Sequence, residues 1–224
     1  QMKVKSEKLK VKSLEIGIIG LGRMGMQIAR RLHKKRFDLV AWNRSPRPRQ
    51  KLKRFFNNSP LLPSFEKRGR GSSIANTVPE LIERLKAPRI IWLMLPAHET
   101  DKFIQELSES LSAGDMVIDG SNSFYRDSIK RAKKLARHKI YYLDAGVSGG
   151  VWGERNGFSI MVGGERQVFK KAESIFRALA SPSPNPSHQG RGKQKKFPPT
   201  GGEGKGRGES YGLVGRTGTG HFVK

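Results

Sequence analysis

The three glycines of Gly20-Leu21-Gly22-Arg23-Met24-Gly25 have the spacing of a dinucleotide-binding turn. In such a turn the first glycine permits a tight bend, the second lets the backbone approach a pyrophosphate, and the third lets a helix pack on a strand. An apolar run, 14–20, precedes the segment and a helical pattern follows it, so bound phosphates would face a helix N-terminus. We therefore predict a dinucleotide site that uses Gly20, Leu21, Gly22, Arg23, Met24 and Gly25.

Three further candidate cofactor ligands, Asn43-Arg44-Ser45, end the next predicted strand. A site for NAD would place an acidic residue here, about 20 residues after the glycines, to bind the ribose 2′-hydroxyl. A carboxylate repels a 2′-phosphate, whereas Arg44 can bind one through its charged fork and Ser45 can add a hydroxyl. The three residues therefore favour NADP as cofactor. The alternative is that Arg44 is simply an exposed arginine in a basic loop.

Three more segments resemble motifs of the 6-phosphogluconate dehydrogenase family. They are DGSNSFYRDS at 119–128, AGVSGG at 145–150 and GTGHFVK at 218–224. Together with the glycine turn they cover the chain outside two basic segments, and WLMLP followed by DGSNSFYRDS is most similar to the shorter bacterial form of the family. The resemblance implies an N-terminal NADP-binding domain followed by a large all-helical domain.

The same resemblance assigns roles to individual residues. Asn122 would bind substrate hydroxyls and the nicotinamide side of the cofactor, and Ser148, Gly149 and Gly150 would bind the carboxylate of a phosphorylated sugar acid. Lys224 would be the catalytic base. We also expect Leu95, which ends the apolar run 89–95, to contact the cofactor.

The reaction implied by the resemblance is the NADP-dependent oxidation of 6-phospho-D-gluconate to ribulose 5-phosphate and CO2, a step of the pentose phosphate pathway. In it a neutral lysine takes the proton of the substrate 3-hydroxyl while a hydride moves to the nicotinamide. The resulting 3-keto acid then loses CO2. A lysine base needs a lowered pKa, which burial or a neighbouring cation provides.

The chain departs from the family pattern after Lys224, where the helical domain would begin. The histidine, asparagine and acidic residue that complete the family's site, and a phosphate-binding arginine, would all follow Lys224, and Ser121 stands where the family usually has glycine. We expect residues 1–224 alone to bind cofactor without turning over substrate. A homodimer is expected only for the full-length enzyme.

Two other functions remain possible from the sequence. A β-hydroxyacid dehydrogenase of the 3-hydroxyisobutyrate type shares the glycine turn, the Val-Ser-Gly-Gly turn and the segment 161–164, although it usually has a Ser-Thr pair at the strand end. A basic protein could also associate with nucleic acid. We expect no specific nucleic-acid site, because no aromatic residues alternate with the charge and the Lys and Arg of the predicted helix 124–137 are interpreted as a solvated face.

The elements that must position these residues alternate between strands and helices. Apolar runs predict strands, and longer stretches with helical spacing predict helices. The predicted strands are 14–20, 38–42, 72–75, 89–95, 116–119, 140–144 and 158–162, and the predicted helices are 24–35, one that begins near Thr77, 98–111, 124–137 and 165–178. This order predicts an α/β fold, a Rossmann-like doubly wound and mostly parallel sheet.

Charge and composition divide the chain further. Residues 46–70 and 181–209 are rich in Pro, Gly, Lys and Arg and have the composition of insertions. We predict a basic tail at 1–13, the cofactor domain at 14–180 with a disordered insert at 57–71, and a second disordered insert at 181–209. Residues 210–224 are predicted to form the last strand and the start of a linker helix.

The overall composition excludes several classes of protein. The 224 residues include 44 Lys and Arg against 19 Asp and Glu, a formal net charge of +25, and no cysteine. Without cysteine there is no disulfide, thiol nucleophile or thiolate zinc site, and the five histidines have no metal-ligand spacing, so no metal is expected. No apolar run approaches the length of a membrane span, and we expect a cytoplasmic location.

Overall fold

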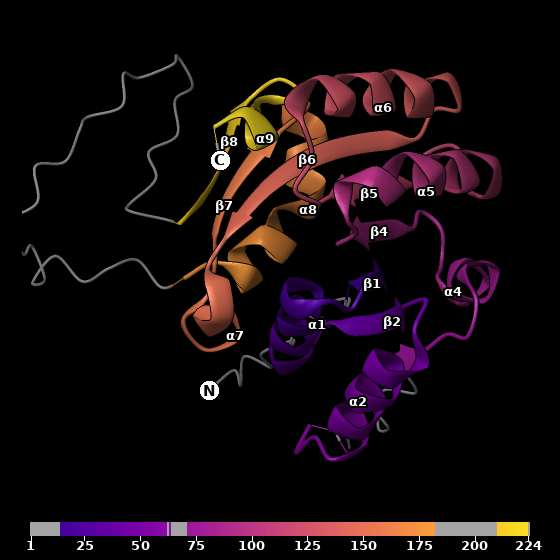
Figure 1. Ribbon diagram of the computed structural model, residues 1–224, viewed down its shortest axis with the longest axis vertical. Coiled ribbons are helices and arrows are strands. Elements are labelled where there is room, and N and C mark those ends of the chain that lie inside the picture. Colours follow the sequence, from indigo (N-terminus) through magenta and orange to yellow (C-terminus); the bar gives the residue numbers. More distant parts are fainter. Residues whose placement is uncertain (1–13, 62, 64–70, 182–209, 224) are drawn as a thin grey trace, which may run out of the picture.

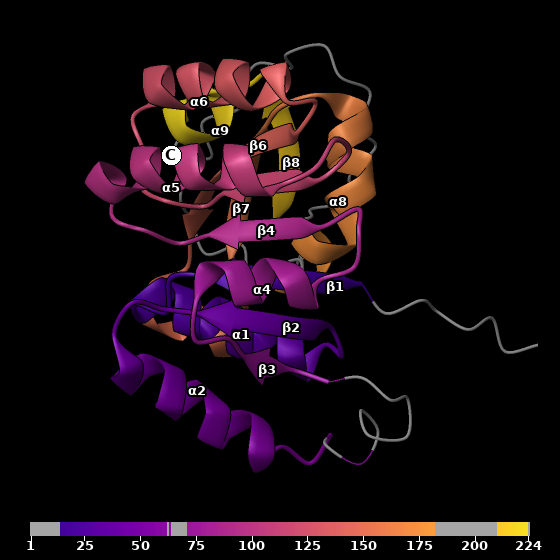
Figure 2. The ribbon, with the colours of Figure 1, turned by 90° about the vertical axis from the view of Figure 1, so that its right-hand side faces the viewer.

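The computed structural model describes residues 14–61, 63, 71–181 and 210–223. Eight strands among them form one sheet in the order β3-β2-β1-β4-β5-β6-β7-β8 (Figure 1; β3 is labelled in Figure 2). Only the pair β6–β7 is antiparallel within this sheet. The strands are β1 Glu15–Ile19, β2 Asp38–Trp42, β3 Ser73–Ile74, β4 Ile90–Leu93, β5 Met116–Asp119, β6 Tyr141–Ser148, β7 Ser159–Gly163 and β8 Tyr211–Gly215.

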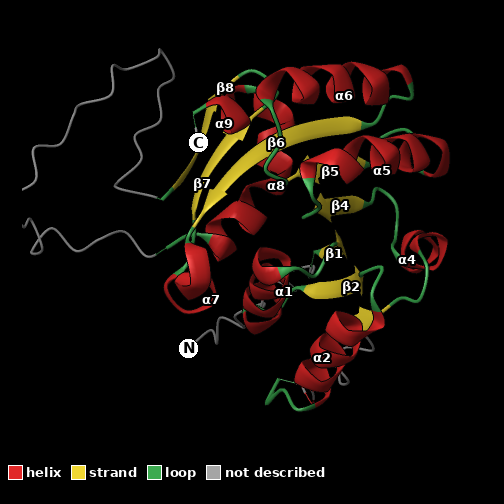
Figure 3. Ribbon diagram, in the orientation of Figure 1, coloured by secondary structure: helices red, strands yellow, loops and turns green. Residues whose placement is uncertain are grey.

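Helices cover both faces of the sheet (Figures 2 and 3). Side chains of α1, α2 and α8 share one buried apolar cluster with the sheet, and side chains of α4, α5 and α6 share a second. The helices are α1 Arg23–Lys34, α2 Pro46–Asn57, α4 Val78–Arg84, α5 Ala97–Ser110, α6 Tyr125–Arg137, the 3-10 helix η1 Gly150–Trp152, α7 Gly153–Asn156, α8 Arg166–Leu179 and α9 Thr219–Phe222. The predicted fold class, a doubly wound and mostly parallel α/β sheet, is confirmed.

Strands buried on both faces explain why the sequence shows continuous apolar runs rather than alternation. In β1, Ile16 and Ile18 join the cluster on the α1 side, while Ile19 joins the cluster on the α4 side. The predicted start of the helix near Thr77 is also confirmed. The Thr77 hydroxyl accepts a hydrogen bond from the Glu80 N–H, and the Glu80 carboxylate accepts one from the Asn76 N–H. These two reciprocal hydrogen bonds cap the N-terminus of α4.

The interpretation of residues 46–70 as an insertion is wrong for its first half. Residues 46–57 form α2, whose Leu52 and Phe56 are buried against the core. Pro46 and Pro48 lie in the first turn, where a missing N–H is tolerated, so they help to start the helix. Most of the predicted insert 57–71, nearly all of the insert 181–209 and the tail 1–13 lie outside the described residues.

The described part of the predicted insert is attached to α1 through His33. The buried imidazole forms hydrogen bonds of 2.8 Å to the Ser59 hydroxyl through Nε2 and to the Ser72 hydroxyl through Nδ1. These two serines flank the segment whose residues are mostly outside the described part. Burial lowers the pKa of His33 to about 4, although the nearby Asp38 opposes the shift, so the ring is neutral at pH 7.

Candidate cofactor and substrate site

The glycine turn between β1 and α1 needs glycine at its first and third positions. Gly20 has a φ of +100°, and a Cβ there would overlap the backbone carbonyl of Met94. A Cβ at Gly25 would overlap the carbonyl oxygen of Gly20, so this glycine lets α1 pack directly on the turn. Both glycines therefore have the structural roles that the sequence predicts.

Neither the backbone conformation nor the packing requires glycine at position 22. Its φ is −65°, which any residue can adopt, and a Cβ there would meet no atom within 4 Å. The open space lies at the N-terminus of α1, where Gly22 is the N-cap and no described side chain caps the helix. Uncapped N–H groups beside open space fit the pyrophosphate of a dinucleotide.

Asn43 joins the end of β2 to the glycine turn. Its side-chain oxygen accepts the Leu21 N–H at 2.8 Å, and its amide nitrogen donates to the Ser45 carbonyl at 3.3 Å. The side chain thus spans the two loops that the sequence assigns to the cofactor. Its contacts show that Asn43 positions the turn.

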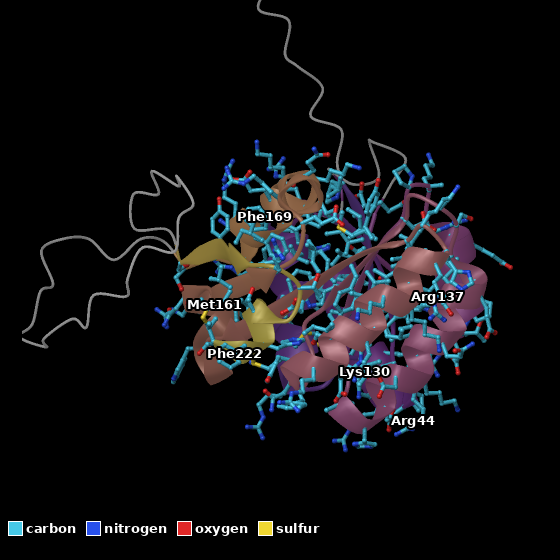
Figure 4. The ribbon with its side chains drawn as sticks, turned by 90° about the horizontal axis from the view of Figure 1, so that it is seen from above. Arg44, Lys130, Arg137, Met161, Phe169 and Phe222 are labelled. Atoms are coloured by element: carbon cyan, nitrogen blue, oxygen red, sulfur yellow. The ribbon has the colours of Figure 1, made fainter. Side chains whose placement is uncertain are left out.

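Arg44 lies at the periphery of the molecule, well apart from Phe222 of α9 (Figure 4). Its side chain is 77% exposed and forms an ion pair with Glu99 at the start of α5, with 2.9 Å between Nη2 and Oε1. The Glu99 side chain is 22% exposed, and a solvent-accessible pair of this kind contributes only about 0–1 kcal/mol to stability. The guanidinium can therefore leave Glu99 for a stronger anion at little cost.

Leu95 connects the glycine turn to the loop after β5. Its side chain lies next to Gly20, 3.2 Å from the position that a Cβ would take, and its N–H donates to the Ser121 hydroxyl at 3.2 Å. The loops after β1, β2, β4 and β5 are therefore in contact at the carboxyl ends of the strands, where open parallel sheets bind ligands.

A buried ionic network holds the loop that carries Asn122. Asp119 accepts hydrogen bonds from the Arg131 guanidinium at 3.0 Å, the Tyr142 hydroxyl at 2.9 Å and the Ser121 N–H at 3.0 Å. Arg131 also donates to the Ser123 hydroxyl at 2.6 Å. Because residues on both sides of Asn122 are fixed, the exposed Asn122 projects from a rigid loop.

The network has consequences for protonation. Burial raises the pKa of Tyr142 well above its usual value, and the charge of Asp119 raises it further, so the hydroxyl stays a donor. Burial lowers the pKa of Arg131, but Asp101 and Asp119 more than compensate and raise it. Only 3% of the Arg131 side chain is exposed, so the interpretation of the cations on helix 124–137 as a solvated face is wrong for this residue.

Ser148 is the last residue of β6, and the turn that it forms with Gly149 and Gly150 is attached to α1. Gly150 has a φ of +52°, and its carbonyl accepts a hydrogen bond from Gln27 Nε2 at 3.1 Å. The Gln27 side-chain oxygen accepts the Glu154 N–H at 3.1 Å. The helix that begins at the glycine turn thus also holds the candidate substrate turn, a link that the sequence does not reveal.

The segment 218–223 is fixed by Asp144 of β6. The buried carboxylate accepts the Gly218 N–H at 2.6 Å and the His221 N–H at 3.0 Å, and a 2.7 Å hydrogen bond joins His221 Nδ1 to the Ser128 hydroxyl of α6. Asp144 pairs with Asp119 in the register of β5 and β6. The segment therefore lies near the loop of Asn122, while Lys224 lies outside the described residues.

No group of three or more His, Cys, Asp or Glu side chains in the described part of the chain could hold a metal ion. Among the same residues, no helix has the length and apolar character needed to cross a membrane.

The strand order, the glycine turn and the uncapped helix N-terminus define a dinucleotide-binding domain of the Rossmann type. Residues 15–190 match the family model of the NAD binding domain of 6-phosphogluconate dehydrogenase. The chain belongs to this family, whose members are oxidoreductases. It is 36% identical over 170 residues to the decarboxylating 6-phosphogluconate dehydrogenase of Candida albicans, covering 75% of this chain and 31% of that protein.

Solved structures of dehydrogenases share the fold of this chain. The 6-phosphogluconate dehydrogenase of Plasmodium falciparum, described with its cofactor NADP+ and with its substrate, is 25% identical, with a TM-score of 0.70 over 93% of this chain and 38% of that one. The 3-hydroxyisobutyrate dehydrogenase of Mycobacterium tuberculosis has a TM-score of 0.68 at 17% identity over 94% of this chain and 57% of that one, which shows a shared fold. The chain spans 31% to 51% of the length of the curated relatives it matches.

Proposed function

We propose that the chain is the NADP-binding domain of a decarboxylating 6-phosphogluconate dehydrogenase. The observation that carries the proposal is the direct contact between the glycine turn, Asn43, Leu95 and Ser121 at the carboxyl ends of four neighbouring strands. This arrangement offers a helix N-terminus for a pyrophosphate on one side and the rigid loop of Asn122 on the other. The family match supports the choice of enzyme.

NADP is the proposed cofactor because the end of β2 presents Arg44 and Ser45 and no carboxylate of its own. Arg44 would leave Glu99 and bind the 2′-phosphate through a charge-assisted contact, stronger than the exposed ion pair it replaces. Gly22 leaves room for the pyrophosphate, and Asn43 keeps the turn in place. The nicotinamide, when bound, accepts the hydride.

The substrate would bind between the loop of Asn122 and the turn at Ser148, Gly149 and Gly150. Asn122 would orient the sugar-acid hydroxyls, and the Ser148 hydroxyl with the adjacent N–H groups would hold the carboxylate. Lys224 follows the segment that Asp144 anchors beside α6, and it would take the proton of the substrate 3-hydroxyl.

The proposed reaction oxidises C3 of 6-phosphogluconate and then removes C1 as CO2. The O–H proton of C3 goes to Lys224 and the C3 hydrogen leaves as hydride, so C3 becomes a ketone. The bond between C1 and C2 breaks, C1 leaves as CO2, and the electron pair left on C2 is stabilised by the new ketone. Protonation of C2 gives ribulose 5-phosphate. Accurate placement of the groups that contact the substrate matters because an error of about 1 Å can cost on the order of 100-fold in rate.

The substrate class is tested by titrating the NADP-loaded protein with 6-phosphogluconate and, in parallel, with 3-hydroxyisobutyrate. We expect 6-phosphogluconate to bind more tightly and Asn122→Ala to weaken it. The variant Asn57→Ala, which removes an exposed amide at the end of α2, serves as the matched control. Tighter binding of 3-hydroxyisobutyrate would instead assign the chain to the other class of dehydrogenase.

A further inference from the structure

The face of the molecule formed by α1 and α2 is unusually cationic. The two helices carry nine Lys and Arg, four on α1 and five on α2, of which only Arg31 is buried, and neither helix contains Asp or Glu. The two helices contact each other and pack on the same side of the sheet. A repulsive arrangement of this kind costs stability unless anions compensate it.

A cavity of about 1050 Å³ lies between these helices. Five cationic side chains line it, together with Gln50, Phe55, Asn58 and residues 59–61, and no Asp or Glu is among the described lining residues. The cations are Arg30, Lys34, Arg47, Lys51 and Arg54. The volume is that of a pocket for a small molecule.

The carboxylates of the described residues neutralise only part of this lining. Glu154 lies 3.5 Å from Arg30 and 2.7 Å from Lys34, both on α1. On α2, the structure gives Arg47, Lys51 and Arg54 no carboxylate within 4 Å among the described residues. The α2 side of the cavity thus offers three cations that could contact a bound ligand.

We infer that this cavity, which lies beside the glycine turn without including any of its residues, binds a compact ligand carrying two or more phosphate groups. Three clustered cations match adjacent phosphates, each of which can accept charge-assisted hydrogen bonds from Lys or Arg. Arg30, Arg47 and Lys51 also line a smaller cavity that reaches Gly22, so the two anion sites adjoin each other. The inference goes beyond the proposed function, and only its test uses the NADP-bound protein.

A compact polyphosphate fits the cavity better than a nucleic-acid strand. The Arg30 guanidinium lies 4.9 Å from the centre of the Phe55 ring, and the Lys34 ammonium lies 5.9 Å from it. His33 packs against the same ring edge-on, with 5.6 Å between centroids. Phe55 therefore already has partners, whereas binding of single strands relies on aromatic rings that stack with bases.

The test is a calorimetric titration with inorganic tripolyphosphate, carried out on protein saturated with NADP so that the cofactor site cannot take the probe. Salt at about 0.15 M screens contacts between the probe and distant surface charges. Lys51→Glu removes a lining cation. Lys53→Glu is the matched control, because Lys53 is an exposed lysine of the same helix that lines a different cavity and the change of charge is identical.

We expect Lys51→Glu to weaken tripolyphosphate binding by about tenfold and Lys53→Glu by less than about twofold. Equal losses in the two lysine variants would overturn the inference, because binding would then follow net charge alone. A 12-nucleotide oligouridine that loses affinity in Lys51→Glu while tripolyphosphate does not would also overturn it, in favour of a nucleic-acid groove.

Discussion

Arg44 at the end of β2 and Glu99 at the start of α5 form an ion pair across the carboxyl edge of the sheet, with 2.9 Å between Nη2 and Oε1. The arginine is the residue that would bind a 2′-phosphate, so the glutamate competes with the cofactor for it. Glu99 would also repel a phosphate bound nearby. The ion pair therefore lowers the affinity for NADP. It does not affect the binding of NAD, which has no 2′-phosphate.

Glu99→Gln should consequently strengthen NADP binding by about threefold and leave NAD binding unchanged, as expected for the loss of an exposed pair. The dissociation constants are measured by calorimetry for both nucleotides. Glu106→Gln, on the same helix and with the same change of charge, is the control. An equal gain in both variants would mean that only the net charge matters.

Gly22→Ser tests the proposed place of the pyrophosphate. Serine is a good N-cap residue, and its Cβ would enter open space, so the free energy of unfolding should change by less than about 0.5 kcal/mol. The side chain would nevertheless occupy the space before the helix N-terminus and weaken NADP binding by at least about tenfold. Gly212→Ser, in β8 and also beside open space, should alter neither quantity. Unchanged NADP affinity in Gly22→Ser would place the pyrophosphate elsewhere.

Arg131→Met should destabilise the domain strongly, because it leaves Asp119 buried with an unpaired charge. Removal of one partner of a buried pair costs about 3–5 kcal/mol. Urea unfolding measures the loss, and NADP affinity should fall with it as the loop of Asn122 loses its support. Lys130→Met removes a neighbouring cation whose pair with Asp127 is exposed, and should cost less than about 1 kcal/mol. A small effect of Arg131→Met would show that the network does not hold the loop.

His33 should make stability depend on pH. Its pKa is about 4 in the folded protein and 6.5 for an ordinary solvated histidine, so the unfolded chain binds the proton more readily. Its contribution is fully present above pH 6.5 and is lost as the pH falls toward 4. Urea unfolding between pH 7.5 and pH 4.5 should show a shallower decline for His33→Gln than for the unmodified protein. Parallel declines would mean that His33 does not titrate in this window.

The sequence predicts the parts of this site that depend on local backbone geometry. The glycine turn, the capped helix at Thr77 and the alternation of strands and helices along the chain follow from spacing and apolar runs, because each is determined by neighbouring residues. The sequence does not predict α2, because Leu52 and Phe56 are the only buried residues of that helix. Two apolar residues four positions apart are too weak a helical pattern to recognise among so many Lys and Arg. The sequence also does not predict the ion pair between Arg131 and Asp119, which are 12 residues apart. In a helix with many Lys and Arg, the sequence does not distinguish a buried arginine from an exposed one.

The relative affinities of NADP and NAD for the unmodified protein, measured by calorimetry at one salt concentration, test the proposed cofactor site most directly. We predict that NADP binds at least about tenfold more tightly, since a charge-assisted contact contributes roughly 1.5–3 kcal/mol. Arg44→Asp should reverse the order. Equal affinities for the two nucleotides would contradict the proposal and show that Arg44 serves only the exposed pair with Glu99.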